Sequence, residues 1–126
     1  MKTIRQTYLI KASIDKVWQA LTEPKIITKW GAGKTTMDDK VGTKFTLWGG
    51  DIHGKNTKVV KNKELVQDWS SGDWEKPSKV TFTLTPQDDG VKVDLLHEEV
   101  PDKEANEITD GWKQYYLGPL KDLLEK

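Results

Sequence analysis

Few residues in this chain have side chains that could carry acid–base chemistry. The 126 residues include two histidines, His53 and His97, and no cysteine. General acid–base catalysis needs histidines or carboxylates gathered in one pocket where their pKa values are shifted. His97 continues the alternation of Val91, Val93 and Leu95, which predicts a side chain directed inward. It is then either a polar contact for a bound molecule or a strand-end histidine whose nitrogens bond to a neighbour.

The carboxylates also lack the spacing of a catalytic or metal site. Glu98 and Glu99 are adjacent, so in a regular strand they point to opposite faces and cannot form a catalytic pair. Asp51 and His53 in "GGDIHG" have no further ligand nearby in the sequence, whereas a metal site needs several converging ligands. The chain contains no P-loop, no GxGxxG and no GxSxG element. We therefore predict no catalytic residue, no metal and no cofactor.

Composition and charge restrict the partners and the location. Lys and Arg number 20 and Asp and Glu number 20, so the zero net charge favours neither a nucleic-acid surface nor an anionic membrane. The apolar run from Tyr8 to Ile10 is too short for a signal peptide, and no run approaches the roughly 18 apolar residues of a membrane span. The absence of cysteine fits a reducing compartment. We expect a cytoplasmic protein with one domain, residues 1–126.

The elements that must position these residues begin with a strand and two helices. Residues 3–10 are rich in β-branched and aromatic types, which predicts a strand. Residues 13–24 follow a helical pattern, with Ser13 as the N-cap and Pro24 as the stop. A second, shorter helix is expected from Pro24 to Gly31.

A series of strands is expected between residues 34 and 98. Gly, Asp, Asn and Pro recur there every several residues, and the runs between them alternate with period two. The predicted strands cover residues 43–48, 52–60, 63–69, 80–85 and 91–95. The last two form a hairpin whose turn includes Gly90. The glycines of "GGD" at 49–51 mark a turn or bulge, with a close backbone approach to a ligand as the alternative.

The tail is predicted to cover one face of this sheet as an amphipathic helix. Asp102 can cap the helix and Glu104 complements its dipole. Its apolar stripe consists of Ala105, Ile108, Trp112, Tyr115, Tyr116, Leu120 and Leu123. A proline inside a helix costs about 3 kcal/mol, so we expect a kink at Pro119, or a break at Gly118 with Pro119 opening a last turn.

Three separated segments connect the chain to a known family. They are "GTKFTLWGGDIHG" (42–54), "DWSSGDWEKP" (68–77) and "VPDKEANEITDGWKQYY" (100–116). In this order they resemble the carboxy-terminal domain of the Aha-type activators of heat shock protein 90 (Hsp90) ATPase, which belongs to the START-like, or SRPBCC, superfamily. The resemblance implies an α+β helix-grip fold. In that fold a curved antiparallel sheet of about six strands wraps around a long carboxy-terminal helix, and two short helices follow the first strand.

The aromatic residues are the strongest indication of a binding site. The superfamily uses a groove between the long helix and the sheet, and the resemblance together with the inward parity predicts its lining. The predicted groove residues are Trp69, Phe82, Val93, His97, Trp112, Tyr115 and Tyr116. Trp30, Trp48 and Trp74 lie beside expected loops, where exposed aromatic side chains would form a partner surface. The alternative for such residues is packing, because burying one aromatic side chain contributes about 4 to 6 kcal/mol before opposing terms.

Three functions compete on these grounds. We rank first a non-enzymatic domain that binds an apolar small molecule or lipid in the groove. The second is a co-chaperone-like module of the stress response that binds an Hsp90-family chaperone or its client proteins. The third is a cyclase- or hydrolase-type enzyme, for which the sequence offers only His97, Tyr115 and Tyr116 as polar groups in the groove.

Overall fold

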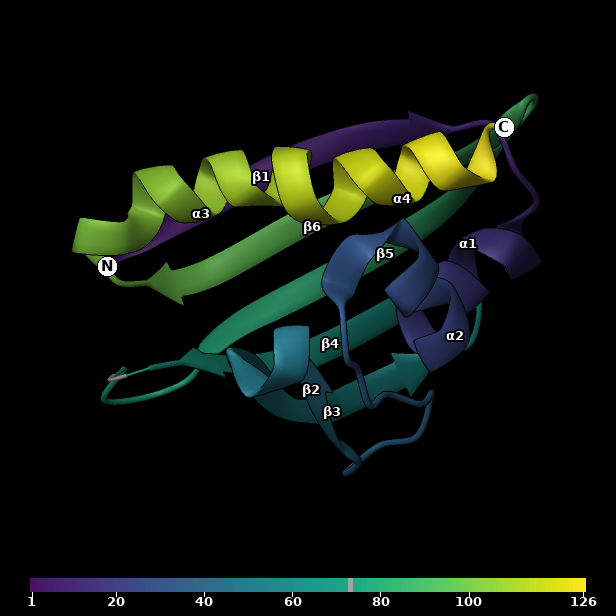
Figure 1. Ribbon diagram of the computed structural model, residues 1–126. Helices are drawn as coiled ribbons and strands as arrows, with labels where there is room; N and C mark the ends of the chain where they lie inside the picture. Colours follow the sequence, from purple (N-terminus) through teal and green to yellow (C-terminus); the bar gives the residue numbers. More distant parts are fainter. Residues whose placement is uncertain (73) are drawn as a thin grey trace.

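A single antiparallel sheet and one long helix dominate the computed structural model, which describes residues 1–72 and 74–126 (Figure 1). The six strands lie in the order β1-β6-β5-β4-β3-β2. Their bounds are β1 (Lys2–Ile10), β2 (Lys44–Leu47), β3 (Ile52–Val60), β4 (Glu64–Ser71), β5 (Ser78–Gln87) and β6 (Gly90–Val100). The predicted α+β helix-grip fold is confirmed. In the described part of the chain, no helix combines the length and the apolar character needed to cross a membrane.

The helices lie on one face of this sheet. Two short helices follow β1, α1 (Ile14–Thr22) and α2 (Pro24–Ile27), as predicted. The carboxy-terminal helix is built from α3 (Ala105–Gly111), a π-helical turn (Trp112–Tyr116) and α4 (Leu117–Leu124). It runs beside β1 and β6, and α1 and the turn that follows α2 contact α4 (Figure 1).

The hairpin of β5 and β6 forms the centre of the covered face. The antiparallel register pairs Phe82 with Leu95 and Leu84 with Val93, and all four side chains are buried. The residues that alternate with them are less buried, so the period-two pattern in the sequence corresponds to one covered face and one solvated face.

The end of β6 departs from strict alternation. Lys2 pairs with Val100 and Ile4 pairs with His97, so β6 has one extra residue there, and Glu99 takes a positive φ of 61°. This β-bulge allows both His97 and Val100 to be buried, while Glu99 is exposed. The expectation that Glu98 and Glu99 point to opposite faces of a regular strand is therefore wrong.

Helix α1 begins and ends at the residues that the sequence indicated. The Ser13 hydroxyl accepts a hydrogen bond from the backbone N–H of Lys16 at 3.3 Å, and Pro24 opens α2 after a one-residue break. The buried face of α1 includes Val17, Trp18 and Leu21. A capping hydroxyl and a proline at the next helix start are local signals, so no tertiary contact is needed to explain these boundaries.

The carboxy-terminal helix is interrupted close to the expected position. Tyr116 has non-helical dihedral angles (φ −120°, ψ −84°), and α4 starts at the next residue. Pro119 is then in the first turn of α4, where a missing backbone N–H costs little. The break therefore lies two residues before the predicted position, Gly118. At Gly118 itself, a Cβ would lie 1.9 Å from the carbonyl oxygen of Lys113, so only glycine fits beside the π-helical turn.

Candidate functional site

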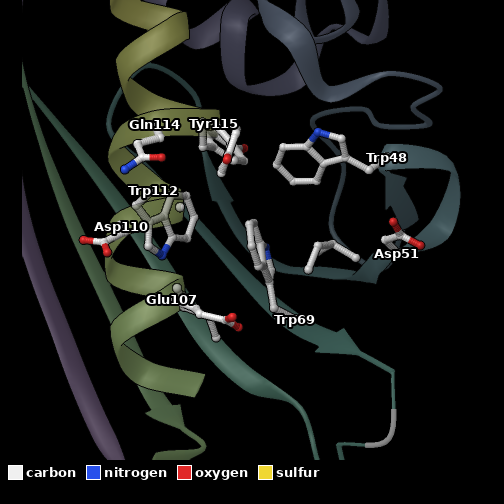
Figure 2. Close-up of a pocket in the computed structure, with 12 residues that line it drawn as sticks. Trp48, Asp51, Trp69, Glu107, Asp110, Trp112, Gln114 and Tyr115 are labelled. Carbon is white, nitrogen blue, oxygen red and sulfur yellow. The ribbon is translucent and has the colours of Figure 1, made fainter. Parts of the chain in front are cut away.

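An open cleft with a volume of about 570 Å³ lies beside the carboxy-terminal helix (Figure 2). One wall is the side of this helix between Glu107 and Tyr116. The opposite wall consists of Trp48, Asp51, Ile52 and Trp69, which come from the β2–β3 connection and from β3 and β4. The cleft therefore joins three segments that are far apart in the sequence.

Trp48 reaches this wall through an unusual backbone conformation. Its φ is 51°, in the left-handed region that non-glycine residues rarely adopt, and the next two residues are Gly49 and Gly50, also with positive φ. This tight turn confirms the predicted bend at "GGD". The Trp48 indole N–H donates a hydrogen bond to the carbonyl of Gly31 at 3.2 Å, so the ring is anchored at its nitrogen while its side chain is only partly buried. Strain of this kind is often retained where a side chain must be presented to a partner.

A cluster of buried aromatic rings forms the base of the cleft. Trp69 and Trp112 are stacked with ring centroids 4.7 Å apart, and Trp112 lies at the same centroid distance from Tyr116. Trp48 meets Tyr116 edge-on at 6.3 Å. Since these rings are held by one another, the shape of the cleft is formed before any ligand arrives.

A buried hydrogen-bond network holds the indole nitrogen of Trp69 in place. The Trp69 indole N–H donates to Oε1 of Gln67 at 2.8 Å, and Nε2 of Gln67 donates to Oδ1 of Asn56 at 2.9 Å. Nδ2 of Asn56 donates in turn to the backbone carbonyls of Asp38 and Lys40 at 2.9 and 3.1 Å. Both amide side chains are completely buried. The network ties the loop before β2 to the sheet under the cleft.

This network was not predicted from the sequence. Its signal was present, because Gln67 shares the inward parity of Leu65 and Trp69 in β4 and is a polar residue between these two apolar ones. An amide at an inward strand position requires partners for its donors and acceptor. Which groups supply them depends on the loop around Asp38, which sequence periodicity does not place.

His97 points inward as predicted but is not part of the cleft lining. It is fully buried, Nδ1 accepts a hydrogen bond from the Trp112 indole N–H at 3.0 Å, and Nε2 lies 2.7 Å from the Ser78 hydroxyl. The ring therefore carries its proton on Nε2, and Ser78 donates onward to the carbonyl of Trp69 at 3.2 Å. Burial lowers the pKa of His97 to about 4. Of the two interpretations of His97, the structure corresponds to the histidine satisfied by its neighbours.

Tyr116 differs from His97, because its buried polar atom has no hydrogen-bond partner among the described residues. That atom is the hydroxyl oxygen, and the side chain is 1% exposed and lies within the aromatic cluster. Burial raises the pKa of Tyr116 well above its usual value, so the phenol stays neutral. Tyr116 is also among the residues that line the cleft, although its hydroxyl oxygen is itself buried.

The predicted groove residues divide into two sets. Trp69, Trp112, Tyr115 and Tyr116 line the cleft. Phe82, Val93 and His97 do not, because the helix packs directly on them and each is 0% exposed. The predicted position of Tyr115 within the buried stripe is also wrong. It is 62% exposed, because the π-helical turn directs Trp112 and Tyr116 toward the sheet and leaves Tyr115 at the rim.

The three tryptophans predicted to form a partner surface, Trp30, Trp48 and Trp74, lie in three different environments. Trp30 is 4% exposed and donates its indole N–H to the carbonyl of Ala20 at 2.9 Å, so its assignment to a surface is wrong. A π-helical turn (Thr28–Ala32) directly after α2 places Trp30 in the core. Trp48 lies in the cleft wall, and Trp74 is half-buried with its indole N–H bonded to the carboxylate of Glu104.

The cleft has charged groups of one sign only. Its lining includes Asp51, Glu107 and Asp110, and no lysine, arginine or histidine. Within residues 1–72 and 74–126, no three His, Cys, Asp or Glu side chains converge in a way that could hold a metal ion. The arrangement is thus an aromatic surface with carboxylates at its edges, which suits non-covalent binding.

Curated relatives of this chain are larger proteins. The human protein named activator of 90 kDa heat shock protein ATPase homolog 1 is 26% identical over 121 residues, which is 94% of this chain and 35% of that protein. The Dictyostelium discoideum protein named activator of 90 kDa heat shock protein ATPase homolog is 30% identical over 89 residues, 68% of this chain and 23% of that protein. The chain therefore spans about a third or less of the length of these relatives.

Solved structures of similar length have the same fold. An Hsp90 activator from Plasmodium falciparum superposes with a TM-score of 0.89 at 25% identity, covering 98% of this chain and 96% of that one. The Aha1 dimer from Colwellia psychrerythraea gives a TM-score of 0.82 at 28% identity, with 99% and 97% covered. The family model described as "Activator of Hsp90 ATPase homolog 1-like protein" matches residues 11–125. The predicted resemblance is confirmed, and the chain belongs to the family of Activator of Hsp90 ATPase homolog 1-like proteins.

Proposed function

We propose that this domain is a non-enzymatic binding domain that holds an apolar small molecule in the aromatic cleft. The observation that carries the proposal is the cleft itself, with about 570 Å³ between Trp48 and Trp69 on one side and Trp112 and Tyr115 on the other. Ligand sites in proteins commonly have volumes of about 300 to 1,000 Å³ and aromatic linings with few polar groups. We place this function in the cytoplasm, since a chain without cysteine suits a reducing compartment.

The states of the polar groups favour binding over catalysis. Both ring nitrogens of His97 are engaged by Trp112 and Ser78, and its lowered pKa keeps it neutral near pH 7. The buried phenol of Tyr116 has a raised pKa and therefore a weak tendency to release its proton. A general acid or base needs a pKa near the working pH and access to the substrate. His97 and Tyr116 lack the first property, and because the titrating atoms of both are buried they also lack the second.

A glycine in the cleft wall provides a direct test. Gly111 has helical dihedral angles, and a Cβ added there would make an ordinary contact of 3.9 Å with the Tyr115 ring. Gly111→Ala adds little volume, whereas Gly111→Leu places a large side chain in the cleft. We expect N-phenyl-1-naphthylamine, a neutral fluorescent probe, to bind the wild-type protein and the alanine variant, and to bind the leucine variant at least about tenfold more weakly.

The location of the probe is checked by NMR. Amide shift changes on titration should cluster in residues 48–52, at Trp69 and in residues 107–116, which contain the lining of the cleft. Probe binding that persists in Gly111→Leu, or shift changes clustered elsewhere on the molecule, would contradict the assignment to this cleft. Circular dichroism of both variants controls for folding.

A second function, binding of an Hsp90-family chaperone, is favoured by the relatives rather than by the cleft. The human relative is named as an activator of the 90 kDa heat shock protein ATPase, and the Saccharomyces cerevisiae relative, 26% identical over 82 residues, is named Hsp90 co-chaperone AHA1. We propose that this domain contacts the chaperone of its own organism. A pulldown together with an ATPase assay tests this proposal. No binding at micromolar concentrations and no change in ATPase rate would reject it.

A further inference from the structure

We infer that the cleft selects apolar cations, specifically small alkyl- or arylammonium compounds. The inference rests on the proposed function and adds the chemical class of the ligand. It depends on the charges of the cleft, on the exposure of two aromatic rings, and on the unpaired hydroxyl of Tyr116.

Carboxylates flank the cleft from both walls. Asp51 lies beside Trp48, and Glu107 extends from the helix toward Trp69 (Figure 2). Asp110 also contributes to the lining, although its carboxylate is directed away from the Trp48 wall. Among the described residues, none of these carboxylates is engaged in an ion pair or a side-chain hydrogen bond. Their negative charge is therefore available to a ligand.

The bias in charge is local. The chain as a whole has equal numbers of acidic and basic residues, yet no basic side chain lines the cleft. The helix dipole favours acidic residues in the first turn of a helix, which accounts for Glu107 but not for Asp110, near the end of α3. It does not account for Asp51 on the opposite wall. The dipole also gives no reason why the basic residues Lys103 and Lys113, which lie in the same region of the chain, are both outside the lining.

The aromatic rings provide the apolar contact and the cation site. Trp48 is partly exposed and Tyr115 is 62% exposed, so part of each ring can meet a ligand directly. A cation within about 6 Å of an aromatic face is attracted by the ring quadrupole, most strongly by tryptophan. The methyl groups of a substituted ammonium carry the charge and are also apolar, so they match both kinds of surface.

Tyr116 supplies an independent indication of a ligand. Its side chain is 1% exposed and lines the cleft, and its hydroxyl has no partner among the described residues. Buried polar atoms are nearly always paired in folded proteins. The oxygen of this lining residue is itself buried, and its two unused lone pairs are a source of partial negative charge near the aromatic base of the cleft.

A pair of isosteric probes separates charge from shape. Phenyltrimethylammonium and tert-butylbenzene have the same outline and differ in one positive charge. We expect the cation to bind at least about threefold more tightly than the neutral compound at low salt, followed by amide shifts and tryptophan fluorescence. The preference should decrease as the salt concentration rises, because the carboxylates are exposed.

Matched charge variants identify the residues involved. The double variant Asp51→Asn with Glu107→Gln keeps the shape and removes two charges, and we expect it to bind phenyltrimethylammonium about two- to fivefold more weakly, with tert-butylbenzene unchanged. Asp122→Asn is the control, since Asp122 is exposed on α4 and does not line the cleft. It should leave both affinities unchanged.

Each outcome distinguishes this inference from the proposed function. Equal affinities for the two probes, or equal losses in the double variant and the control, would overturn the cation selectivity and leave apolar binding in place. Tighter binding of tert-butylbenzene than of phenyltrimethylammonium would also overturn the cation selectivity and leave apolar binding in place. Binding of neither probe, together with no binding of N-phenyl-1-naphthylamine, would overturn both proposals.

Discussion

At the scale of single residues, His97 shows how a polar side chain is made part of a core. Its two ring nitrogens are engaged by Trp112 and Ser78, so the neutral ring is fully satisfied although it is completely buried. A protonated ring would place a donor opposite the Trp112 indole N–H, which is itself only a donor. The native structure therefore disfavours the imidazolium.

This arrangement predicts a decline in stability at mildly acidic pH. The folded pKa of His97 is about 4, below its usual value of 6.5, so the unfolded chain takes up the proton first as the pH falls. The stabilising contribution is complete above about pH 6.5 and is lost as the pH falls to about 4, with a total loss of about 3 kcal/mol. Chemical denaturation at a series of pH values measures this change.

His97→Gln is the matched variant for this prediction. A glutamine can accept from Trp112 and donate to Ser78 but does not titrate. Its unfolding free energy should vary less than that of the wild type between pH 6.5 and 4. An identical pH dependence in both proteins would assign the effect to other groups.

Most substitutions in a protein core lower the free energy of unfolding, but the unpaired hydroxyl of Tyr116 predicts that its removal raises it. Removing a buried polar atom that has no partner relieves its desolvation cost. Tyr116→Phe should therefore raise the free energy of unfolding by about 1 kcal/mol. Tyr115→Phe, at the exposed rim, should change it by less than about 0.5 kcal/mol. Destabilisation by Tyr116→Phe would instead indicate that the hydroxyl bonds to a buried water.

At the scale of elements, the buried amides of Asn56 and Gln67 join β3, β4 and the loop before β2. Replacing Asn56 with leucine removes the partners of Gln67 and of the Asp38 and Lys40 carbonyls at once. We expect a loss of about 2 to 4 kcal/mol in unfolding free energy. Faster hydrogen exchange in residues 38–43 should accompany it. Asn106→Leu, at an exposed helix position, is the control and should be nearly neutral.

The two glycines of the carboxy-terminal helix make a matched pair of predictions. Gly111→Ala should stabilise the protein by about 0.5 to 1 kcal/mol, because alanine is the better helix former and the added Cβ meets only the Tyr115 ring at 3.9 Å. Gly118→Ala should destabilise it by about 1 to 3 kcal/mol, because the Cβ would meet the Lys113 carbonyl oxygen at 1.9 Å. Thermal unfolding measures both. Equal effects of the two substitutions would contradict the π-helical turn.

At the scale of the whole molecule, ligand binding and stability are linked. A compound that binds the folded cleft and not the unfolded chain raises the unfolding free energy by about 2.7 kcal/mol at 100 times its dissociation constant. A saturating probe should therefore raise the melting temperature of the wild-type protein and of Gly111→Ala, but not that of Gly111→Leu. A similar rise in the leucine variant would mean that the probe binds elsewhere.

The amino-acid sequence by itself determined the elements, their order and the covered face of the sheet. The Ser13 cap and Pro24 bound the first helices, alternation marks β5 and β6, and the "GGD" glycines mark a turn. These signals are local, since each depends on the conformational preferences of a few neighbouring residues. The family resemblance and the inward direction of His97 could be predicted for the same reason.

Only the tertiary structure decided which aromatic residues form the core and which form the cleft. Trp30 and Trp48 both lie beside turns in the sequence, yet one is buried and the other lines the cleft. The bulge at Glu99, the network of Gln67 and the placement of Asp51 opposite Glu107 were equally out of reach. Each depends on where segments far apart in the chain meet, and periodicity along one segment contains no information about its distant neighbours.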